Sequence, residues 1–440
     1  VSFYYGLQDI NSGTGTLYIG AKSYTYGSRY SSALNTSLYA GGSDDSNSFT
    51  LRSSNTTEDA IKIEAEQFAT SGSWTYAIHF NQETNLLATG SGGGIKVLTS
   101  NHGGDNNGIV TRDILNILAS SGSIELTDST ADAYLYLGSN AYFGSKSGVS
   151  GLISSSTDIT LQYDRYSFLK TPEIATSGSL TIKPYSNSFT DNPLSSWFNF
   201  NTNSHTLSSF TFGKSTNTSN IYVNSALTST GPITVYGANI YVSESISSTG
   251  VGDITLSASA LFDSTNPTRK TISNNSGDIY IIADSDNVGL LRLDYLTFNA
   301  GSDNLFIRGS TMSWNTSYAT APYINGSGDI VFESTDSNFG QYVNTAWFQW
   351  NVDGNTIGSL RVGKTTNNQD VYLGSTLTAG GSINIYGDDI IINSSQTLTA
   401  GTNSNIVLSA ASNFINNSGS SALNVSGTGR WIVYAADNDN

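Results

Sequence analysis

The chain has no cysteine among its 440 residues, which excludes a disulfide framework. A secreted protein of this length can rely on a large hydrophobic core instead, so export stays compatible with the composition. Charged residues are also scarce, at 12%, against about 25% in ordinary soluble domains. Glycine, serine, threonine and asparagine take their place. We therefore expect a surface rich in hydroxyl and amide groups.

Basic residues and long apolar runs are missing as well. Eighteen Lys and Arg face 34 Asp and Glu, giving a net charge of −16 with no basic stripe. An acidic chain repels a phosphate backbone, so nucleic acid is not expected as a partner. No run approaches the roughly 18 apolar residues of a membrane-spanning helix, so no membrane insertion is expected. The first ten residues lack the features of a signal peptide, and we expect a soluble chain that is mature or excised.

Aromatic and β-branched residues are plentiful. The chain has 25 Tyr, 18 Phe and 6 Trp, whereas disordered chains lack such residues, so the chain should fold. Helix formers are scarce, and the summed propensity indicates an all-β protein. Residues 56–67, TTEDAIKIEAEQ, leave the choice open. Their early acidic residues suit a helix, and their I-K-I alternation suits a strand.

An internal repeat is the most informative feature of the sequence. Residues 213–240 align without gaps with residues 363–390, a shift of 150 residues, and 13 of the 28 positions are identical. Trp197-Phe198 matches Trp347-Phe348 at the same shift. Self-similarity at a fixed period is typical of solenoids. We expect divergent solenoid rungs over 1–190, a repeat unit over 191–340, and a second copy, truncated at its C-terminal end, over 341–440.

A shorter rhythm lies inside the long repeat. Gly-x-Ile followed by alternating apolar residues recurs at Gly252, Gly277, Gly328 and Gly381. The first interval is 25 residues and the second is 51, which suits one and two turns of a β-solenoid. Each turn should form one rung of short strands broken by Gly, Asn, Asp or Ser. The sequence therefore predicts a right-handed parallel β-helix with rungs of about 20–30 residues whose inward Ile, Val, Leu and Phe stack in continuous ladders.

Paired acidic residues are the candidates for catalysis. Asp388-Asp389 resembles the two carboxylates that a glycosidase needs. The sister repeat has Ala238-Asn239 at these positions, so the pair is better read as a bend between two strands. Asp44-Asp45 lies beside two glycines and has no repeat partner. No catalytic residue is therefore assigned, and the chain is not expected to be an enzyme.

The sequence gives equally little evidence for metal-binding or modification sites. His79, His102 and His205 have no metal-ligand spacing and are interpreted as incidental surface or loop residues. Asp284 to Asn287 and Asp437 to Asn440 place oxygen atoms at alternating spacing, which Ca²⁺ favours, but neither completes a calcium loop. They are read as solvated turns, so no cofactor is expected beyond loose Ca²⁺ binding. Glycosylation sequons, most of them due to chance, occur at Asn35, Asn55, Asn217, Asn274, Asn315, Asn325, Asn393, Asn416 and Asn424.

Two aromatic clusters remain. Trp197-Phe198-Asn199-Phe200 and Trp347-Phe348-Gln349-Trp350 are either sugar-stacking platforms or structural residues at a rung junction. Their recurrence at the repeat shift favours the structural role.

The rungs Gly252 to Ala258 and Gly381 to Ile385, together with Gly427 to Tyr434, resemble repeats of large exoproteins of the filamentous haemagglutinin type. The resemblance is clearest over 197–440. It implies export through a partner outer-membrane pore and a long right-handed β-helix used in adhesion, aggregation or biofilm formation. The NPNG-like motifs of the family's secretion module are missing, which leaves the export route open.

We expect a structural, adhesive β-solenoid at the bacterial cell surface, outside the cell. It should form part of a fibre that self-associates or assembles end to end and contacts host or bacterial glycans. One alternative is a β-helical polysaccharide-degrading enzyme or a tailspike-like phage protein. Another is an ice-binding solenoid with regular Thr rows, which the variable rung spacing disfavours.

Overall fold

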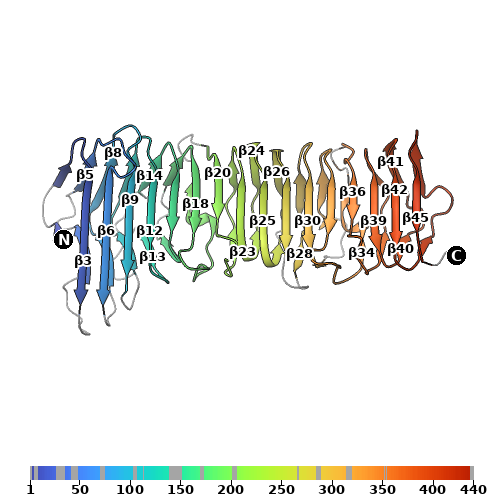
Figure 1. Ribbon diagram of the computed structural model, residues 1–440, viewed down its shortest axis with the longest axis horizontal. Helices are drawn as coiled ribbons and strands as arrows, with labels where there is room; N and C mark the ends of the chain where they lie inside the picture. Colours follow the sequence, from blue (N-terminus) through green and yellow to red (C-terminus); the bar gives the residue numbers. More distant parts are fainter. Residues whose placement is uncertain are drawn as a thin grey trace. The chain divides into compact units, whose positions relative to one another are not determined.

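The computed structural model describes residues 2–3, 8–25, 35–40, 48–69, 75–102, 107–111, 113–137, 151–168, 173–200, 206–264, 267–283, 289–313, 320–350, 352 and 354–436. Short strands dominate these residues, and neighbouring strands pair in parallel (Figure 1). The turns η1 (Ser195–Trp197) and η3 (Thr345–Trp347) are 3₁₀-helical. The chain divides into two compact units, Val1–Ser219 and Asn220–Asn440. The all-β prediction is confirmed.

The first unit is built from three parallel sheets, and each turn of the chain contributes one strand to each sheet, except that the turn with β19 and β20 has no described strand in the first sheet. The first sheet contains β1 (Ser2–Phe3), β4 (Asn35–Ala40), β7 (Thr75–Phe80), β10 (Asn107–Thr111), β13 (Tyr134–Leu137) and β16 (Arg165–Phe168). The second contains β2 (Gln8–Asn11), β5 (Ser48–Ser53), β8 (Glu83–Ala88), β11 (Leu115–Ala119), β14 (Leu152–Ser155), β17 (Glu173–Thr176) and β19 (Asn199–Phe200). The third contains β3 (Leu17–Thr25), β6 (Ile61–Ala69), β9 (Ile95–Asn101), β12 (Ile124–Asp128), β15 (Ile159–Gln162), β18 (Ser179–Lys183) and β20 (Ser209–Phe212).

The second unit repeats this three-faced plan. One face contains β23 (Ile233–Val242), β25 (Ile254–Asp263), β27 (Ile279–Ala283), β30 (Leu305–Gly309), β33 (Ile330–Glu333), β36 (Leu360–Val362), β39 (Ile383–Gly387), β42 (Ile406–Ala410) and β45 (Trp431–Tyr434). Another contains β22 (Leu227–Ser229), β24 (Ile246–Val251), β26 (Lys270–Ser276), β29 (Leu296–Asn299), β32 (Tyr323–Asn325) and β35 (Gln349–Trp350), then β38 (Leu377–Thr378), β41 (Leu398–Thr402) and β44 (Leu423–Ser426). The remaining strands are β21 (Ile221–Val223), β28 (Leu290–Arg292), β31 (Thr311–Met312), β34 (Val343–Asn344), β37 (Val371–Leu373), β40 (Ile390–Ile392) and β43 (Phe414–Asn416).

The register of the stacked strands gives the length of each rung. In the second unit Ile254 pairs with Ile279, and Ile279 pairs with Leu305, so each pair is separated by one turn of the predicted length. The predicted parallel β-solenoid and its rung length are confirmed here, while its handedness stays a prediction. The first unit begins with longer turns, because Leu17 pairs with Ile61. The extra residues fall between strands, so the parallel pairing of β3 with β6 and of β6 with β9 has no break in register.

Inward-facing apolar side chains form continuous columns, as the alternation predicted. One column of the second unit contains residues that are all at most 3% exposed: Ile233, Ile254, Ile279, Leu305, Ile330, Leu360, Ile383 and Ile406. The equivalent column of the first unit contains Leu17, Ile61, Ile95, Ile124, Ile159, Leu180 and Phe210. A single rung could not bury these side chains, so each rung depends on its neighbours.

The Gly-x-Ile marker has a steric reason. Gly252 has φ 141° and Gly277 has φ 124°, values that side chains rarely tolerate. A Cβ atom on Gly252 would lie 2.5 Å from Cδ of Pro232, and one on Gly277 would lie 2.5 Å from the carbonyl oxygen of Gly252. The backbone of one rung therefore rests directly on the rung before it.

The residue after this glycine ties successive rungs together through its side chain. The Asp253 Oδ1 atom accepts from the backbone amide of Asp278, and Asp278 Oδ1 accepts from that of Asn304, each at 2.9 Å. Asn304 and Asp329 continue this turn ladder into the next two rungs. Because the amides are satisfied by side chains of the neighbouring turn, the corners of the solenoid are held as well as the sheets.

The 150-residue shift found in the sequence relates equivalent contacts. The backbone amide of Phe189 donates to Asn217 Oδ1 at 3.2 Å, and that of Phe339 donates to Asn367 Oδ1 at 3.3 Å. Each pair lies within its own unit. The boundaries placed at 190/191 and 340/341 stay predictions.

Residues 56–67, for which the sequence left helix and strand open, form a turn followed by most of β6. Lys62, Glu64 and Glu66 are partly exposed, whereas Ile61, Ile63 and Ala65 are buried, so the I-K-I alternation has the period of a strand. Inward packing of these three residues therefore overrides the acidic start that suited a helix.

Candidate functional site

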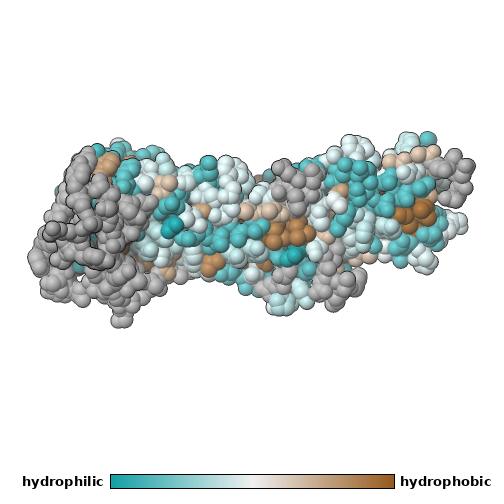
Figure 2. Space-filling model, turned by 90° about the horizontal axis from the view of Figure 1, so that it is seen from below, coloured by the Kyte–Doolittle hydropathy of each residue, from teal (hydrophilic) through white to brown (hydrophobic). Residues whose placement is uncertain are grey.

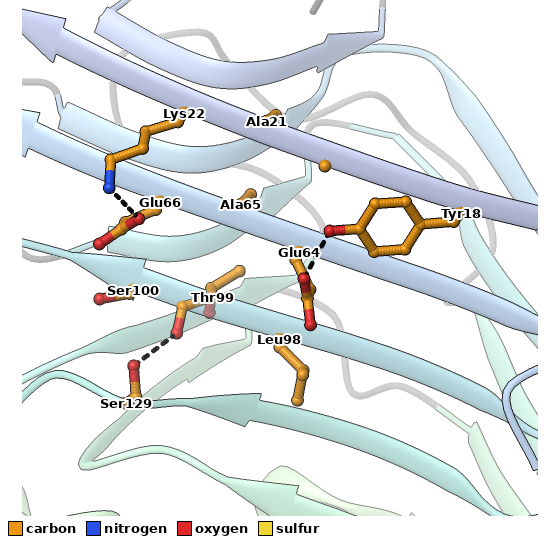
Figure 3. A pocket seen from close by; sticks show the side chains of 11 residues that line it. Tyr18, Ala21, Lys22, Glu64, Ala65, Glu66, Leu98, Thr99, Ser100 and Ser129 are labelled. Carbon is orange, nitrogen blue, oxygen red and sulfur yellow. Dashed lines mark hydrogen bonds and ion pairs between the residues drawn. The ribbon is translucent and has the colours of Figure 1, made fainter.

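A hollow of about 450 Å³ lies on the outer face of the first unit. Outward side chains of β3, β6 and β9 line it, and the inward-facing Ala21 and Ala65 contribute to its floor. Figure 3 shows Tyr18 and Lys22 reaching from β3 toward Glu64 and Glu66 on β6. We call this feature the outer hollow.

Gly20 makes room for the Tyr18 ring in the outer hollow. It lies between Tyr18 and Lys22 on the outer side of β3, and its register partner on β6 is Glu64. Glu64 in turn pairs with Leu98 on β9, so this column runs glycine, carboxylate, leucine across three rungs. Since glycine has no side chain, the Tyr18 ring can lie over it and reach Glu64; a Cβ at this position would be 2.9 Å from the Tyr18 hydroxyl.

Glu64 is held by two donors. Tyr18 donates its hydroxyl proton to Glu64 Oε2 at 2.6 Å, and the Lys62 ammonium lies 2.8 Å from Oε1. The hydrogen bond from Lys62, followed by that from Tyr18, lowers the pKa of Glu64. The same contact raises the pKa of Tyr18, because its hydroxyl is bonded to a carboxylate. Glu64 is therefore ionised and Tyr18 is neutral near neutral pH.

A second ion pair closes the other side of the outer hollow. The Lys22 Nζ atom lies 2.7 Å from Glu66 Oε2, and 4.8 Å from the centroid of the Phe68 ring. Phe68 also stacks on His102, with centroids 4.7 Å apart. The hollow is thus walled by one exposed tyrosine, by the Lys22–Glu66 pair and by Glu64, whose partner Lys62 is not among the lining residues.

A buried carboxyl group lies inside the first unit. Asp128 Oδ2 accepts from the Thr99 hydroxyl at 2.6 Å, and Asp128 Oδ1 accepts from the backbone amide of Thr130 at 2.7 Å. The Tyr163 hydroxyl lies 3.2 Å from that of Thr99. Burial raises the pKa of Asp128 to about 6. This group is part of the core and does not face the outer hollow.

Asp388 and Asp389 occupy the bend between β39 and β40, as the sequence predicted. Asp388 Oδ1 accepts from the Ser412 hydroxyl at 2.6 Å. Asp389 Oδ1 accepts from both the backbone and the side-chain nitrogen of Asn413, at 2.9 and 2.8 Å. Both carboxylates therefore bind the following rung.

The histidines and acidic turns are not brought together in the described part of the chain. The surface or loop position expected for His79 is wrong, because the residue is buried in β7 against Tyr76; His102 is exposed and contacts Ser100. His205, Asp44-Asp45, Asp284 to Asn287 and Asp437 to Asn440 lie outside the described residues. Among the residues that are described, no group of three or more His, Asp or Glu is placed to hold a metal ion.

The two aromatic clusters surround the 3₁₀ turns. Phe198 packs against Tyr166 and Phe212, and Phe348 packs against Phe332. Phe198 and Phe348 are each 2% exposed. The Trp350 indole donates to the Thr345 carbonyl at 2.9 Å. These contacts support the structural interpretation of the clusters.

Two of the sequon asparagines are buried by their own hydrogen bonds. Asn217 and Asn274 are 3% and 4% exposed. The Asn274 side chain donates to the carbonyls of Gly252 and Gly277, both at 2.8 Å. A glycan could not be attached to either residue in the folded chain.

The sequence did not reveal the outer hollow. Gly20 and Glu64 are far apart along the chain, and only the register brings them side by side. The visible signal was the alternation of charges on residues 62–66, next to a strand with one central glycine.

No family model, curated protein or solved structure matches this chain. Among the described residues no helix combines the length and the apolar character that crossing a bilayer would need.

Proposed function

We propose that the chain is a structural and adhesive β-solenoid of a bacterial surface fibre, acting outside the cell. The observation that carries this proposal is a column of uncharged polar side chains on the outer face of the second unit. It contains Thr228, Ser247, Ser273, Asn299 and Asn325, one from each of five successive rungs. All five are partly or fully exposed.

The column repeats the same chemistry at the spacing of the strands. Ser273 donates its hydroxyl proton to Ser247 at 3.1 Å. Neighbouring strands lie about 4.8 Å apart, so a linear polymer along the stack would meet a donor or acceptor at every rung. Each contact is weak, but contacts made together add up, because the later ones form within an already bound complex.

The first unit carries a comparable array. Asp9, Thr50, Asn85 and Asn116 follow one another on its second sheet. The Asn116 side chain donates to Asn85 Oδ1 at 2.8 Å. In the view of Figure 2, hydrophilic and neutral residues cover most of the coloured surface, and hydrophobic patches are small and separate. Such a surface suits polar polymers such as glycans better than apolar partners.

The acidic residues of the turns support a scaffold role. Asp253, Asp278 and Asp329 accept backbone amides of the next rung, as Asp389 does on another corner. Their oxygens stabilise the stack, which is the property that a fibre under tension needs.

End-to-end self-association belongs to the same proposal. On β45, Trp431 and Tyr434 are 57% and 58% exposed. Trp431 is in register with the inward Ile406, so another rung stacked on this strand would pair its backbone and cover the Trp431 ring. Electron microscopy of the native material, for filaments and their axial repeat, tests this part directly.

The adhesive role is tested with beads that carry many copies of the chain. Such beads should stick to bacterial cells and to polysaccharide-coated surfaces, whereas the free chain should compete poorly because it lacks multivalency. Absence of adhesion at any bead density would contradict the proposal. In parallel, the chain is incubated with bacterial and plant polysaccharides, with and without Ca²⁺. Sustained release of reducing or unsaturated ends, abolished by Asp388→Ala or Asp389→Ala, would favour a polysaccharide-degrading enzyme instead.

A further inference from the structure

We infer that the outer hollow binds a short stretch of a neutral polysaccharide. The inference rests on the proposed function, because it names the class of glycan and the residues that would recognise it. Three observations carry it: the shape of the hollow, the pairing of its charges, and the chemistry of its walls.

The shape fits a chain segment running along the stack. The lining residues come from β3, β6 and β9, which are successive strands of one sheet, and from Ser129, which directly follows β12, the next strand of that sheet. Two strand spacings amount to about 10 Å, so the floor is long enough for more than one sugar ring. Gly20 gives room to the Tyr18 ring, which lies over it and forms one wall of the hollow, while Lys22 lies on the other side of Gly20 on this face.

Each carboxylate of the hollow is already paired with a lysine, Glu66 with the lining residue Lys22 and Glu64 with Lys62 outside the lining. Lys22 lies 2.7 Å from Glu66, and Lys62 lies 2.8 Å from Glu64. A charged ligand would have to compete with one of these pairs, whereas sugar hydroxyls can use the second lone pair of each carboxylate oxygen. Hydrogen bonds to charged groups are stronger than those between neutral groups. The pairing therefore favours an uncharged, hydroxyl-rich ligand.

The walls offer one apolar face together with these polar groups. Tyr18 is 57% exposed, and its ring is fixed by the 2.6 Å hydrogen bond to Glu64. Leu98 provides an apolar surface next to Glu64, and Ser100 adds a hydroxyl near Glu66. A sugar ring has the same division, with C–H groups on its faces and hydroxyls at its edge. An aromatic ring held in place meets the C–H face with little loss of side-chain entropy.

The sharpest test fills the hollow without harming the fold. In Gly20→Thr the new Cβ would lie 2.9 Å from the Tyr18 hydroxyl, and its nearest neighbours are all atoms of the Tyr18 side chain, so the substitution displaces the Tyr18 ring and breaks its hydrogen bond to Glu64 without a clash against the backbone. Threonine also favours strands over glycine, so the variant should melt no lower than the natural chain. Binding of neutral oligosaccharides of glucose, mannose, galactose or xylose to the full chain is measured by calorimetry and by saturation-transfer NMR.

We expect at least one of these neutral oligosaccharides to bind, and Gly20→Thr and Tyr18→Ala each to weaken that binding by about tenfold or more. Tyr185→Ala is the matched control, since Tyr185 is 41% exposed and lies in a turn outside the hollow. It should bind like the natural chain.

Three outcomes would overturn the inference: no binding of any neutral oligosaccharide, binding unchanged in both folded variants, or binding confined to oligogalacturonate or oligoglucosamine and abolished by salt. The bead assay separates this failure from failure of the proposed function. Beads that carry Gly20→Thr and still adhere would show that adhesion uses other surfaces.

Discussion

Asp389 binds Asn413 twice, through one oxygen that accepts from both the backbone and the side-chain nitrogen at 2.9 and 2.8 Å. This contact predicts the effect of mutating Asp389, which belongs to the acidic pair that most resembles the carboxylates of a glycosidase. Asp389→Ala should lower the free energy of unfolding by about 1–3 kcal/mol, because two donors lose their acceptor.

Asp389→Asn is the matched variant. It keeps an oxygen at the Oδ1 position, so its urea midpoint should lie closer to that of the natural chain than the midpoint of Asp389→Ala. An Asp389→Ala variant that unfolds at the same urea concentration as the natural chain would show that the bend does not depend on this carboxylate.

A neighbouring pair of residues tests which way the strands face. Ile383 is fully buried, and Asn384, the next residue of β39, is partly exposed. Ile383→Asp should destabilise the chain by several kcal/mol, roughly 3 or more, since it places a charge in the core. Asn384→Asp should stay within about 0.5 kcal/mol. Thermal melting of the two variants distinguishes them, and equal melting temperatures would mean that Ile383 faces solvent.

Asp128 predicts a pH dependence. Burial raises its pKa to about 6 in the folded chain from an ordinary value of 3.8. The folded state therefore binds this proton more tightly, and the resulting stabilisation is complete below the unfolded pKa. It is lost as the pH rises through the folded pKa. The loss amounts to about 3 kcal/mol, since a difference of one in pKa corresponds to about 1.4 kcal/mol.

Asp128→Asn should remove this dependence. The amide oxygen can accept from Thr130, while the amide nitrogen donates to the Thr99 hydroxyl, which has the Thr127 carbonyl at 3.3 Å as its own acceptor. Urea midpoints measured from about pH 4 to about pH 8 should converge at the acid end and favour the variant at neutral pH. A constant difference between the two chains at every pH would contradict the assignment.

Gly252 and Gly354 form a matched pair for backbone strain. Both have positive φ, 141° and 81°. A Cβ on Gly252 would clash with Pro232, whereas one on Gly354 would meet nothing within 4 Å. Gly354→Ala should cost about 1 kcal/mol from strain alone, and Gly252→Ala should cost at least about 2 kcal/mol more. Comparable melting temperatures for the two variants would mean that the rungs are not in tight contact at Gly252.

The sequence predicted the fold through features that are local in each rung. The Gly-x-Ile marker at Gly252 and Gly277 set the rung length, since both glycines lie in close contact with the rung before them. The bend at Asp388 was also readable, because the sister repeat has Ala238-Asn239 there. Such signals depend on neighbouring residues only.

The outer hollow could not be predicted from the sequence, because it depends on residues that are far apart along the chain. It depends on pairing Gly20 with Glu64 and Glu64 with Leu98, across two turns of unequal length. Both turns are longer than the rhythm of the second unit, so no period in the sequence gives the register. The long-range neighbours of a side chain are fixed here by stacking, which the sequence shows only where rungs are regular.

The parallel stacking of rungs also determines how the second unit responds to force. Its strands follow one another from β23 to β45, so pulling the two ends of this unit apart loads the hydrogen bonds between rungs along their own direction. Hydrogen bonds loaded in this way break one row at a time. The terminal rung therefore detaches before the full force acts on the next rung. A rung of this size would release about 70 to 100 Å of chain when it peels. A tether made of such rungs would therefore lengthen in steps under tension and dissipate work before it broke.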